Sequence, residues 1–145
     1  MRLLKSFLLT AGIAVAGSAW AADAVIKYRQ DQMKVLGGHM GSIAAIMKKE
    51  VPFSDQLAVH AQGLAATAAF TEAVFKEQAL SSKSAAKAEI WSDWERFAAD
   101  AGALKQAADK LAQTAAANDQ AAVRAAMADV GKACKSCHDN FKTKK

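Results

Sequence analysis

The sequence predicts an all-α protein with the architecture of an antiparallel four-helix bundle, and three observations support this fold class. Apolar residues recur at alternating steps of three and four in four segments, which is the spacing of one face of an amphipathic helix. A single proline and an alanine-rich composition favour helix. Alternating Val/Ile/Thr runs and Asn-Gly or Asp-Gly turns, the usual strand and hairpin signals, are missing from the sequence. At 145 residues, 52% of them apolar, the chain is long enough for one domain with a buried core.

The first two helices are predicted over residues 25–49 and 55–79. The inward stripe of the first helix reads Ile26, Arg29, Met33, Leu36, Met40, Ile43 and Met47. Pro52 ends this helix because proline disfavours helical geometry in the residue before it, and Ser54 or Asp55 then offers a capping oxygen. The thinner stripe of the second helix reads Leu57, Leu64, Thr67, Ala68, Thr71, Val74 and Phe75.

The third helix is predicted to start near Lys87, after a loop without periodicity over residues 80–89. Its stripe is the most regular in the chain and reads Ile90, Trp94, Phe97, Ala101, Leu104, Ala108, Leu111 and Ala115. Asn118-Asp119 is predicted to cap the fourth helix. The fourth stripe reads Val123, Met127, Val130, Cys134, Cys137 and Phe141. Short connections between four amphipathic helices are typical of an antiparallel bundle.

Residues 1–21 are predicted to be a cleaved signal peptide. The segment has a basic start at Arg2 and Lys5, an apolar run over residues 7–16, and a small-x-small cleavage site at residues 19–21. An uncleaved membrane helix is the alternative, but it needs about 20 apolar residues, and glycine and serine interrupt this run. We therefore expect an exported, periplasmic domain over residues 22–145 that has no membrane segment after cleavage.

The charge balance of the mature chain makes nucleic acid an unexpected partner. The full sequence carries a formal net charge of +5, and residues 1–21 contain two basic residues and no acidic one, so cleavage lowers it to about +3. The sequence also has no basic patch interleaved with aromatic residues. The basic C-terminal end is the solvated end of a helix, where cations are favourable.

The two cysteines of the chain, Cys134 and Cys137, are followed directly by His138. On a helix, residues three and four apart share a face, so the three side chains project together. A Cys-x-x-Cys-His sequence is typical of covalent attachment of a c-type haem. Two thiols one turn apart add to the two vinyl groups of the porphyrin, and the imidazole becomes the proximal iron ligand.

Three other readings of the two cysteines are weaker. A disulfide at this spacing would close a very small loop and would stabilise the chain little. A redox Cys-x-x-Cys normally opens a helix after a strand, and this chain has no predicted strand. A zinc site would need a fourth ligand and does not match the usual finger spacing.

The whole mature chain resembles the cytochrome c-prime family, which also includes low-spin members. The resemblance rests on the export signal, "YRQDQM" at the start of the first helix, "EIWSDW" at the start of the third, and "GKACKSCHDNFK" on the last. It implies a four-helix bundle with one covalent haem c per chain, redox partner proteins, and a possible homodimer through the first two helices. Ordinary small cytochromes c carry the haem motif near the N-terminus instead.

Arg29 and Gln30 are predicted to contact the haem propionates. A buried guanidinium is unfavourable unless it is paired, and Arg29 is the charged residue on an otherwise apolar stripe. A bidentate pair with a propionate would satisfy it, and Gln30 could add a hydrogen bond. The alternative is an arginine that extends from the end of the bundle into water. The resemblance implies the propionate role for the same pair.

Met33 is predicted to face the iron on the side away from His138. The resemblance implies that a methionine here binds iron in low-spin relatives. In high-spin relatives the residue only blocks this face and leaves five-coordinate iron that admits nitric oxide or carbon monoxide. Thioether ligation stabilises ferrous iron and raises the potential. A core methionine that fills a gap is the alternative. His39 and His60 have the wrong helical phase for a sixth ligand.

The predicted function is that of a periplasmic one-electron carrier, with His138 below the iron and Met33 above it. The alternative is a five-coordinate protein that binds nitric oxide or carbon monoxide, for buffering, sensing or protection. We do not expect an enzyme, because the sequence offers no distal His-Arg pair for peroxide chemistry and no acid–base constellation.

Overall fold

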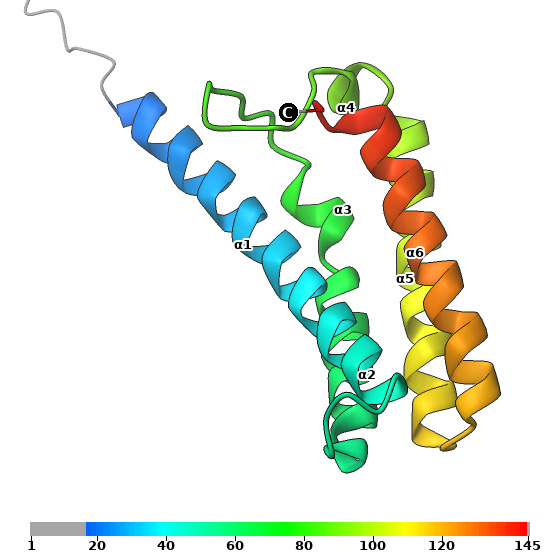
Figure 1. Ribbon diagram of the computed structural model, residues 1–145. Coiled ribbons are helices and arrows are strands. Elements are labelled where there is room, and N and C mark those ends of the chain that lie inside the picture. The colour runs from blue at the N-terminus through cyan, green and yellow to red at the C-terminus, as the bar shows by residue number, and fades with distance from the viewer. Residues whose placement is uncertain (1–16, 145) are drawn as a thin grey trace, which may run out of the picture.

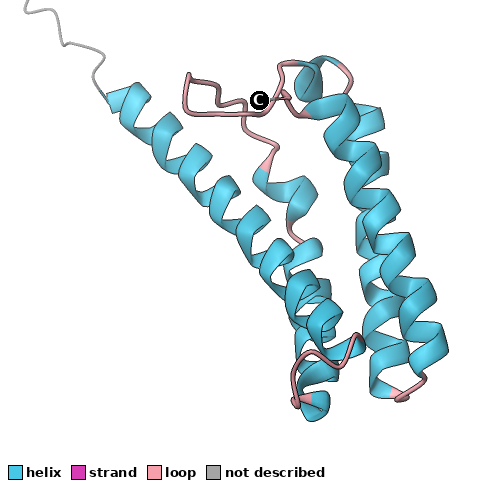
Figure 2. Cartoon of the chain, in the orientation of Figure 1, coloured by secondary structure: helices cyan, strands magenta, loops and turns pink. Residues whose placement is uncertain are grey.

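The computed structural model describes residues 17–144, with side chains described from Trp20 onward. Residues 1–16, which form most of the predicted signal peptide, and Lys145 lie outside the described residues. The helices are α1 (Gly17–Met47), α2 (Leu57–Ala68), α3 (Thr71–Val74), α4 (Glu89–Ser92), α5 (Trp94–Ala116) and α6 (Gln120–Phe141), with a short 3-10 helix η1 (Ser54–Gln56) (Figure 1). The described part contains no strand, only an isolated bridge between Ala86 and Lys142 (Figure 2).

The long helices form the predicted antiparallel bundle as two pairs. Helix α1 packs against α2, and α5 packs against α6 and α2. The two pairs lie close together at the end where α1 finishes and α6 begins, and they diverge toward the end where the chain finishes (Figure 1). Among residues 17–144, no helix is both long enough and apolar enough to cross a bilayer.

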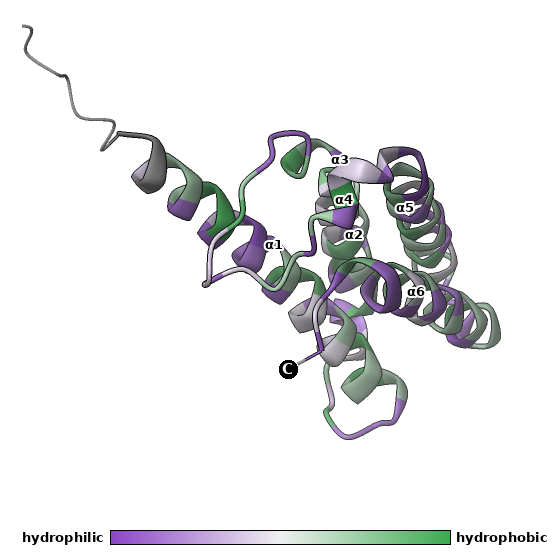
Figure 3. Ribbon diagram, turned by 90° about the horizontal axis from the view of Figure 1, so that it is seen from above, coloured by the Kyte–Doolittle hydropathy of each residue, from purple (hydrophilic) through white to green (hydrophobic). Residues whose placement is uncertain are grey.

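The predicted stripes form the core. Residues of both stripes in the α5–α6 pair, including Leu104, Leu111, Val123 and Val130, are buried together with residues of α1 and α2. A second, aromatic cluster lies at the diverging end and contains Phe75, Ile90, Phe97 and Phe141. Seen from above, hydrophobic and hydrophilic residues alternate around the helices, as expected for amphipathic segments (Figure 3).

The turn between α5 and α6 follows the predicted capping. The Asp119 side chain accepts hydrogen bonds from the backbone N–H groups of Ala121 and Ala122, at 3.1 and 3.0 Å. Asn118 just before it has a φ of 55°. Asparagine tolerates this left-handed conformation better than most residues, which explains why so short a connection reverses the chain.

The second helix differs from the prediction of a continuous helix over residues 55–79. Helix α2 ends at Ala68, α3 is a single turn, and no regular structure follows until α4. From Val74 onward, side chains far away in sequence take carbonyl oxygens that a continuing helix would use. Arg29 donates to the carbonyls of Val74, Glu77 and Ala79, and the Trp91 indole donates to the carbonyl of Phe75 at 2.8 Å.

Gly37 and Gly38 in α1 do not lie against another helix of this chain. A Cβ atom added at either position would meet nothing within 4 Å. A close approach is found at Gly63 on α2, where an added Cβ would lie 2.5 Å from the His39 ring. Gly63 therefore leaves the room in which the imidazole of His39 packs against α2.

Candidate functional site

A cavity of about 640 Å³ lies at the diverging end of the bundle, between the α1–α3 side and the α5–α6 pair. This volume falls within the range of roughly 300–1,000 Å³ that is typical of small-molecule and cofactor sites. Most of its lining is apolar, and both the main core and the aromatic cluster contribute to it. All six residues that the sequence singled out for the site line this cavity: Arg29, Gln30, Met33, Cys134, Cys137 and His138.

Helix α6 supplies Cys134, Cys137 and His138 to one wall of the cavity. The wall forms here because Val130, Cys134, Cys137 and Phe141 continue the inward stripe of α6 past the point where α1 and α6 separate. Both cysteines are free thiols and partly buried. The three side chains are thus presented on one helical face to one space.

The protonation of the two thiols distinguishes this pair from a redox-active one. Burial raises the pKa of Cys134, and burial together with Asp100 and Cys134 raises the pKa of Cys137 to about 11. Reactive and redox cysteines have lowered pKa values, because the thiolate is the nucleophile. At neutral pH both of these cysteines stay thiols, which argues against a thiol–disulfide exchange function.

His138 borders the cavity and also reaches solvent. Burial against the cavity wall, and then the cation of Lys142, lower the pKa of His138. A lowered pKa keeps the imidazole neutral, which is the form that binds a metal. Lys142 is fixed beside the cavity because the backbone around it pairs with the loop before α4, through Thr143 N–H to the Ala85 carbonyl at 2.8 Å.

Two polar groups that line the cavity have a buried side-chain oxygen without a hydrogen-bond partner in the described residues. They are the Thr71 hydroxyl and Oδ2 of Asp100. The other carboxylate oxygen of Asp100 accepts a hydrogen bond from the Ser136 hydroxyl at 3.0 Å. Buried polar groups in proteins are nearly always paired, so these two atoms are exceptions; both oxygens are enclosed by the protein and expose almost no surface to the cavity.

Met33 and Arg29 lie on α1, on the wall across the cavity from α6. Met33 is partly buried and packs against both hydrophobic clusters. Arg29 is only 4% exposed. Its guanidinium donates to the carbonyl of Val74 at 2.7 Å, to that of Ala79 at 3.2 Å, and to that of Glu77.

The carbonyl contacts of Arg29 bear on its predicted propionate role, because they already satisfy part of the buried guanidinium. The guanidinium also lies over the Phe75 ring, 4.8 Å from its centroid. Burial of this charge therefore has an explanation that involves no propionate. Three of the five N–H donors of the guanidinium are used by the carbonyls, and two are left for another acceptor.

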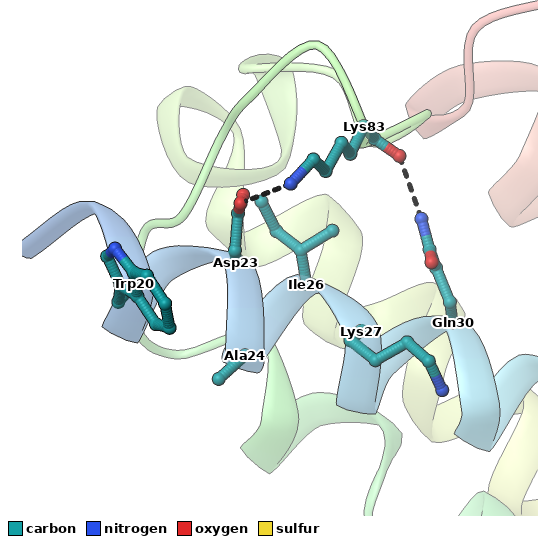
Figure 4. A pocket seen from close by; sticks show the side chains of 7 residues that line it. All are labelled: Trp20, Asp23, Ala24, Ile26, Lys27, Gln30 and Lys83. Atoms are coloured by element: carbon teal, nitrogen blue, oxygen red, sulfur yellow. Dashed lines mark hydrogen bonds and ion pairs between the residues drawn. The ribbon is translucent and has the colours of Figure 1, made fainter.

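Gln30 fixes the same loop to α1 from the outer side. Its side-chain amide donates to the carbonyl of Lys83 at 2.8 Å, and the Lys83 ammonium pairs with Asp23 at 2.6 Å (Figure 4). These residues border a second hollow of about 670 Å³, walled at one end by Trp20. Trp20 precedes the predicted cleavage point, so cleavage would remove that part of the wall.

His39 and His60 lie away from the cavity, in the contact between α1 and α2. Their Nδ1 atoms are 3.2 Å apart, and neither ring is among the residues that line the cavity. A sixth-ligand role for either histidine has no support in this arrangement.

The residues present fit a haem. The cavity has the size and the apolar lining of a cofactor site, and two thiols and a neutral imidazole stand on one wall. The described residues contain no group of three or more His, Cys, Asp and Glu side chains that could hold a metal ion on their own. A porphyrin brings its own nitrogen ligands, so one protein imidazole suffices to hold its iron.

Sequence reasoning missed Thr71 and Asp100 as residues of the site. Thr71 stands on the predicted inward stripe of the second helix. A polar hydroxyl on an otherwise apolar stripe is a feature from which its place in the site could have been predicted. Asp100 lies next to Ala101 of the third stripe and has no distinguishing pattern. Its place beside Ser136 and Cys137 comes only from the packing of α5 against α6.

Comparisons with known proteins agree on one family. The family model described as "Cytochrome C'" matches residues 24–142. Cytochrome c' of Pararhodospirillum photometricum is 38% identical over 121 residues, which cover 83% of this chain and 97% of that protein. Cytochrome c-556 of Agrobacterium fabrum is 39% identical over 138 residues, which cover 92% of this chain and 90% of that protein.

Solved structures show the same fold. Cytochrome c prime from Shewanella frigidimarina matches with a TM-score of 0.79 and 29% identity, covering 85% of this chain and 97% of that one. The nitric oxide complex of a leucine-to-alanine mutant of cytochrome c prime from Alcaligenes xylosoxidans matches with a TM-score of 0.78 and 31% identity, covering 86% and 97%.

Proposed function

This chain belongs to the cytochrome c' family, whose members carry covalently bound haem c, and from that premise we propose a haem protein that binds a diatomic gas. The gas, nitric oxide or carbon monoxide, binds on the haem face turned toward Met33. The observation that carries the proposal is the two-walled cavity, with thiols and imidazole on α6 and a mainly apolar wall around Met33 opposite. Structural neighbours that hold nitric oxide support the choice of ligand.

Each wall has a separate task in this proposal. Cys134 and Cys137 would form the two thioether links, and His138 would hold the iron from the α6 side. The mainly apolar wall excludes water from the opposite face, which favours small neutral ligands over ions. Arg29 holds the loop after α3 in place, and Gln30 ties the same loop to α1. The two remaining N–H groups of Arg29 would donate to a haem propionate.

The second candidate is the one-electron carrier, in which the Met33 thioether is the sixth iron ligand. The observation that favours it is that Met33 lines the cavity on the wall opposite His138. In this case the iron is already six-coordinate, and gases bind poorly. The two candidates therefore differ in the state of a single side chain.

A spectroscopic experiment tests the proposal and separates the two candidates. The protein is produced in cells that mature c-type cytochromes, its mass is measured, and visible spectra are recorded oxidised, reduced, and reduced with carbon monoxide. We expect the mass of one added haem, a high-spin spectrum and ready binding of carbon monoxide. A charge-transfer band from methionine to iron, with indifference to carbon monoxide, would establish the carrier instead.

Two variants complete this experiment. Met33→Ala converts the carrier behaviour into gas binding if Met33 is a ligand, and changes only the rate of gas entry if Met33 merely blocks the face. Met47→Ala is the matched control, because Met47 packs against the same core but does not line the cavity. A colourless protein with the mass of its amino acids alone would refute both candidates.

Location and partners follow the family. Cytochrome c' is a bacterial periplasmic protein, and we propose the same location here, with residues 1–21 as the export signal and 22–145 as the haem domain. The proposal includes redox partner proteins that supply electrons to the iron, and no catalytic turnover.

A homodimer through α1 and α2 is supported by exposed apolar side chains on these helices, Tyr28, Val35 and Val59. The molar mass of the protein in solution tests the dimer.

A further inference from the structure

Asp100 is, among the described residues, the one acidic side chain that lines the cavity. It lies on α5, directly before Ala101 of the inward stripe, and is half-buried. Most of the cavity lining around it is apolar. A carboxylate at this position is unexpected, because a charge against apolar surface is unfavourable unless another group compensates it.

The charge of Asp100 has no counter-ion in the described part of the chain. Asp31, Asp109 and Asp129 each pair with a lysine at the surface, whereas Asp100 forms no salt bridge there. One of its oxygens accepts a hydrogen bond from the Ser136 hydroxyl at 3.0 Å, and the other, Oδ2, is enclosed without a partner. One neutral hydrogen bond is therefore all that offsets this negative charge within the described residues.

The electric field of Asp100 reaches the α6 wall of the cavity. Its hydrogen-bond partner Ser136 directly precedes Cys137, which lines the same cavity. Burial, and then the negative charge of Asp100, raise the pKa of the Cys137 thiol, because a nearby negative charge disfavours the thiolate. A macrocycle joined to Cys137 would lie beside this sulfur and would experience the same charge. Such an interaction acts through space and needs no contact between the carboxylate and the macrocycle.

We propose that the uncompensated negative charge of Asp100 favours ferric over ferrous iron and so lowers the reduction potential of the haem. This inference rests on the proposed haem function. Reduction adds one electron, supplied by a redox partner, and removes one positive charge from the iron porphyrin, so a fixed negative charge stabilises the ferric form more. Charges beside a cofactor are one of the means by which a protein tunes its electronics. Because carbon monoxide binds ferrous iron, Asp100 would confine its binding to more reducing surroundings.

The test measures the reduction potential of the holoprotein by redox titration followed in the visible spectrum. Asp100→Asn removes the charge at nearly constant shape and retains an oxygen that can accept from Ser136. Asp100→Glu retains the charge, and Ser136→Ala removes the hydrogen bond but leaves the charge in place. Asp109→Asn is the matched control, because Asp109 lies on the same helix, pairs with Lys105 at the surface and does not line the cavity.

We expect Asp100→Asn to shift the equilibrium between ferric and ferrous iron about three- to tenfold toward ferrous iron, the effect of one half-buried charge. This corresponds to a potential higher by about 30–60 mV, since a tenfold change for one electron is about 59 mV. Asp100→Glu and Asp109→Asn should keep the parent potential. Ser136→Ala should not raise it, whereas a merely structural role of the contact between α5 and α6 would give Ser136→Ala the same rise as Asp100→Asn.

The outcomes distinguish the inference from the function on which it rests. If the parent protein carries haem and Asp100→Asn has the same potential as Asp109→Asn, the inference is overturned and the haem function stands. Equal rises in Ser136→Ala and Asp100→Asn assign the effect to the hydrogen bond and also overturn it. If the parent protein carries no haem, the function fails and the inference fails with it. If Asp100→Asn does not fold, Asp100→Ser takes its place, and the same rise in potential is required.

Discussion

The two walls of the cavity are held by different kinds of interaction. The α5–α6 pair is joined by two regular apolar stripes and a turn with a standard N-cap at Asp119. The α1–α3 wall has a thinner, alanine-rich stripe, a broken second helix, and polar contacts at Arg29, Gln30 and the His39–His60 pair. The α5–α6 wall, to which we assign the haem attachment, is thus regular, and the opposite wall is assembled from long-range polar contacts.

The difference between the two walls suits their proposed tasks, because one wall has to be rigid and the other has to leave space. A regular apolar pair keeps Cys134, Cys137 and His138 in fixed relative positions, which the proposed covalent attachment and iron ligation would require. A wall held by a few hydrogen bonds to backbone carbonyls leaves room for a cavity, because a fully packed stripe would fill it. Three predictions test whether the two walls differ in this way.

The largest effect is expected on the α1–α3 wall, at Arg29. Arg29→Met removes the donor to three carbonyls and should lower the free energy of unfolding by about 2–4 kcal/mol, because charged donors form the stronger hydrogen bonds and loop carbonyls lose their partner. Urea unfolding of the holoprotein measures this change. Hydrogen exchange should accelerate in residues 75–88, which locates the loss in the loop.

The control for Arg29 is Lys27→Met, on the same helix. Lys27 is exposed and pairs with Asp31 at the surface, and such pairs contribute about 0–1 kcal/mol. Equal stability of the two variants would mean that the carbonyl contacts of Arg29 do not hold this wall together.

A smaller effect is expected at the cap of the α5–α6 wall. Asp119→Ala removes the acceptor for two backbone N–H groups and should lower the free energy of unfolding by about 1 kcal/mol. Asp129→Ala on the same helix is the control, because Asp129 only forms an exposed ion pair with Lys132. The carbon monoxide spectrum should stay unchanged in both variants. A changed spectrum in Asp119→Ala would contradict the rigidity assigned to this pair.

The smallest effect is expected at the His39–His60 pair, and it depends on pH. The two Nδ1 atoms are 3.2 Å apart, so that one ring can donate its N–H to the other, and protonation of both rings would place two N–H donors face to face. Burial, and then His60, lower the pKa of His39 below its ordinary value near 6.5. The folded chain therefore binds fewer protons there than the unfolded chain, so this contribution is present above about pH 6.5 and is lost as pH falls through the lowered pKa.

The measurement compares the free energy of unfolding at pH 7.5 and pH 5 for the parent protein and His60→Gln. The parent protein should lose up to about 1 kcal/mol more than the variant, since one hydrogen bond and one proton are involved. The other titratable groups are the same in both proteins, so their contributions cancel in the difference. Equal losses would mean that the pair does not link α1 to α2.

Local sequence determined most of the architecture and the attachment wall. The steps of three and four in each segment predict the stripes of α1, α5 and α6, and Asp119 predicts the start of α6, because periodicity and capping depend on residues within a few positions of each other. The spacing of Cys134, Cys137 and His138 predicts the haem for the same reason. One helical turn brings the three side chains to one face.

Only the tertiary structure decided how the opposite wall is built. The carbonyls that Arg29 binds lie 45 to 50 positions away in the chain, in the segment after α2 over which the local pattern predicts helix to residue 79. The contact of His39 with His60, and the missing partner of the Thr71 hydroxyl, likewise arise from packing. Spacing along the chain fixes which side chains share a face of one helix, but which groups meet across helices is fixed only when the helices pack.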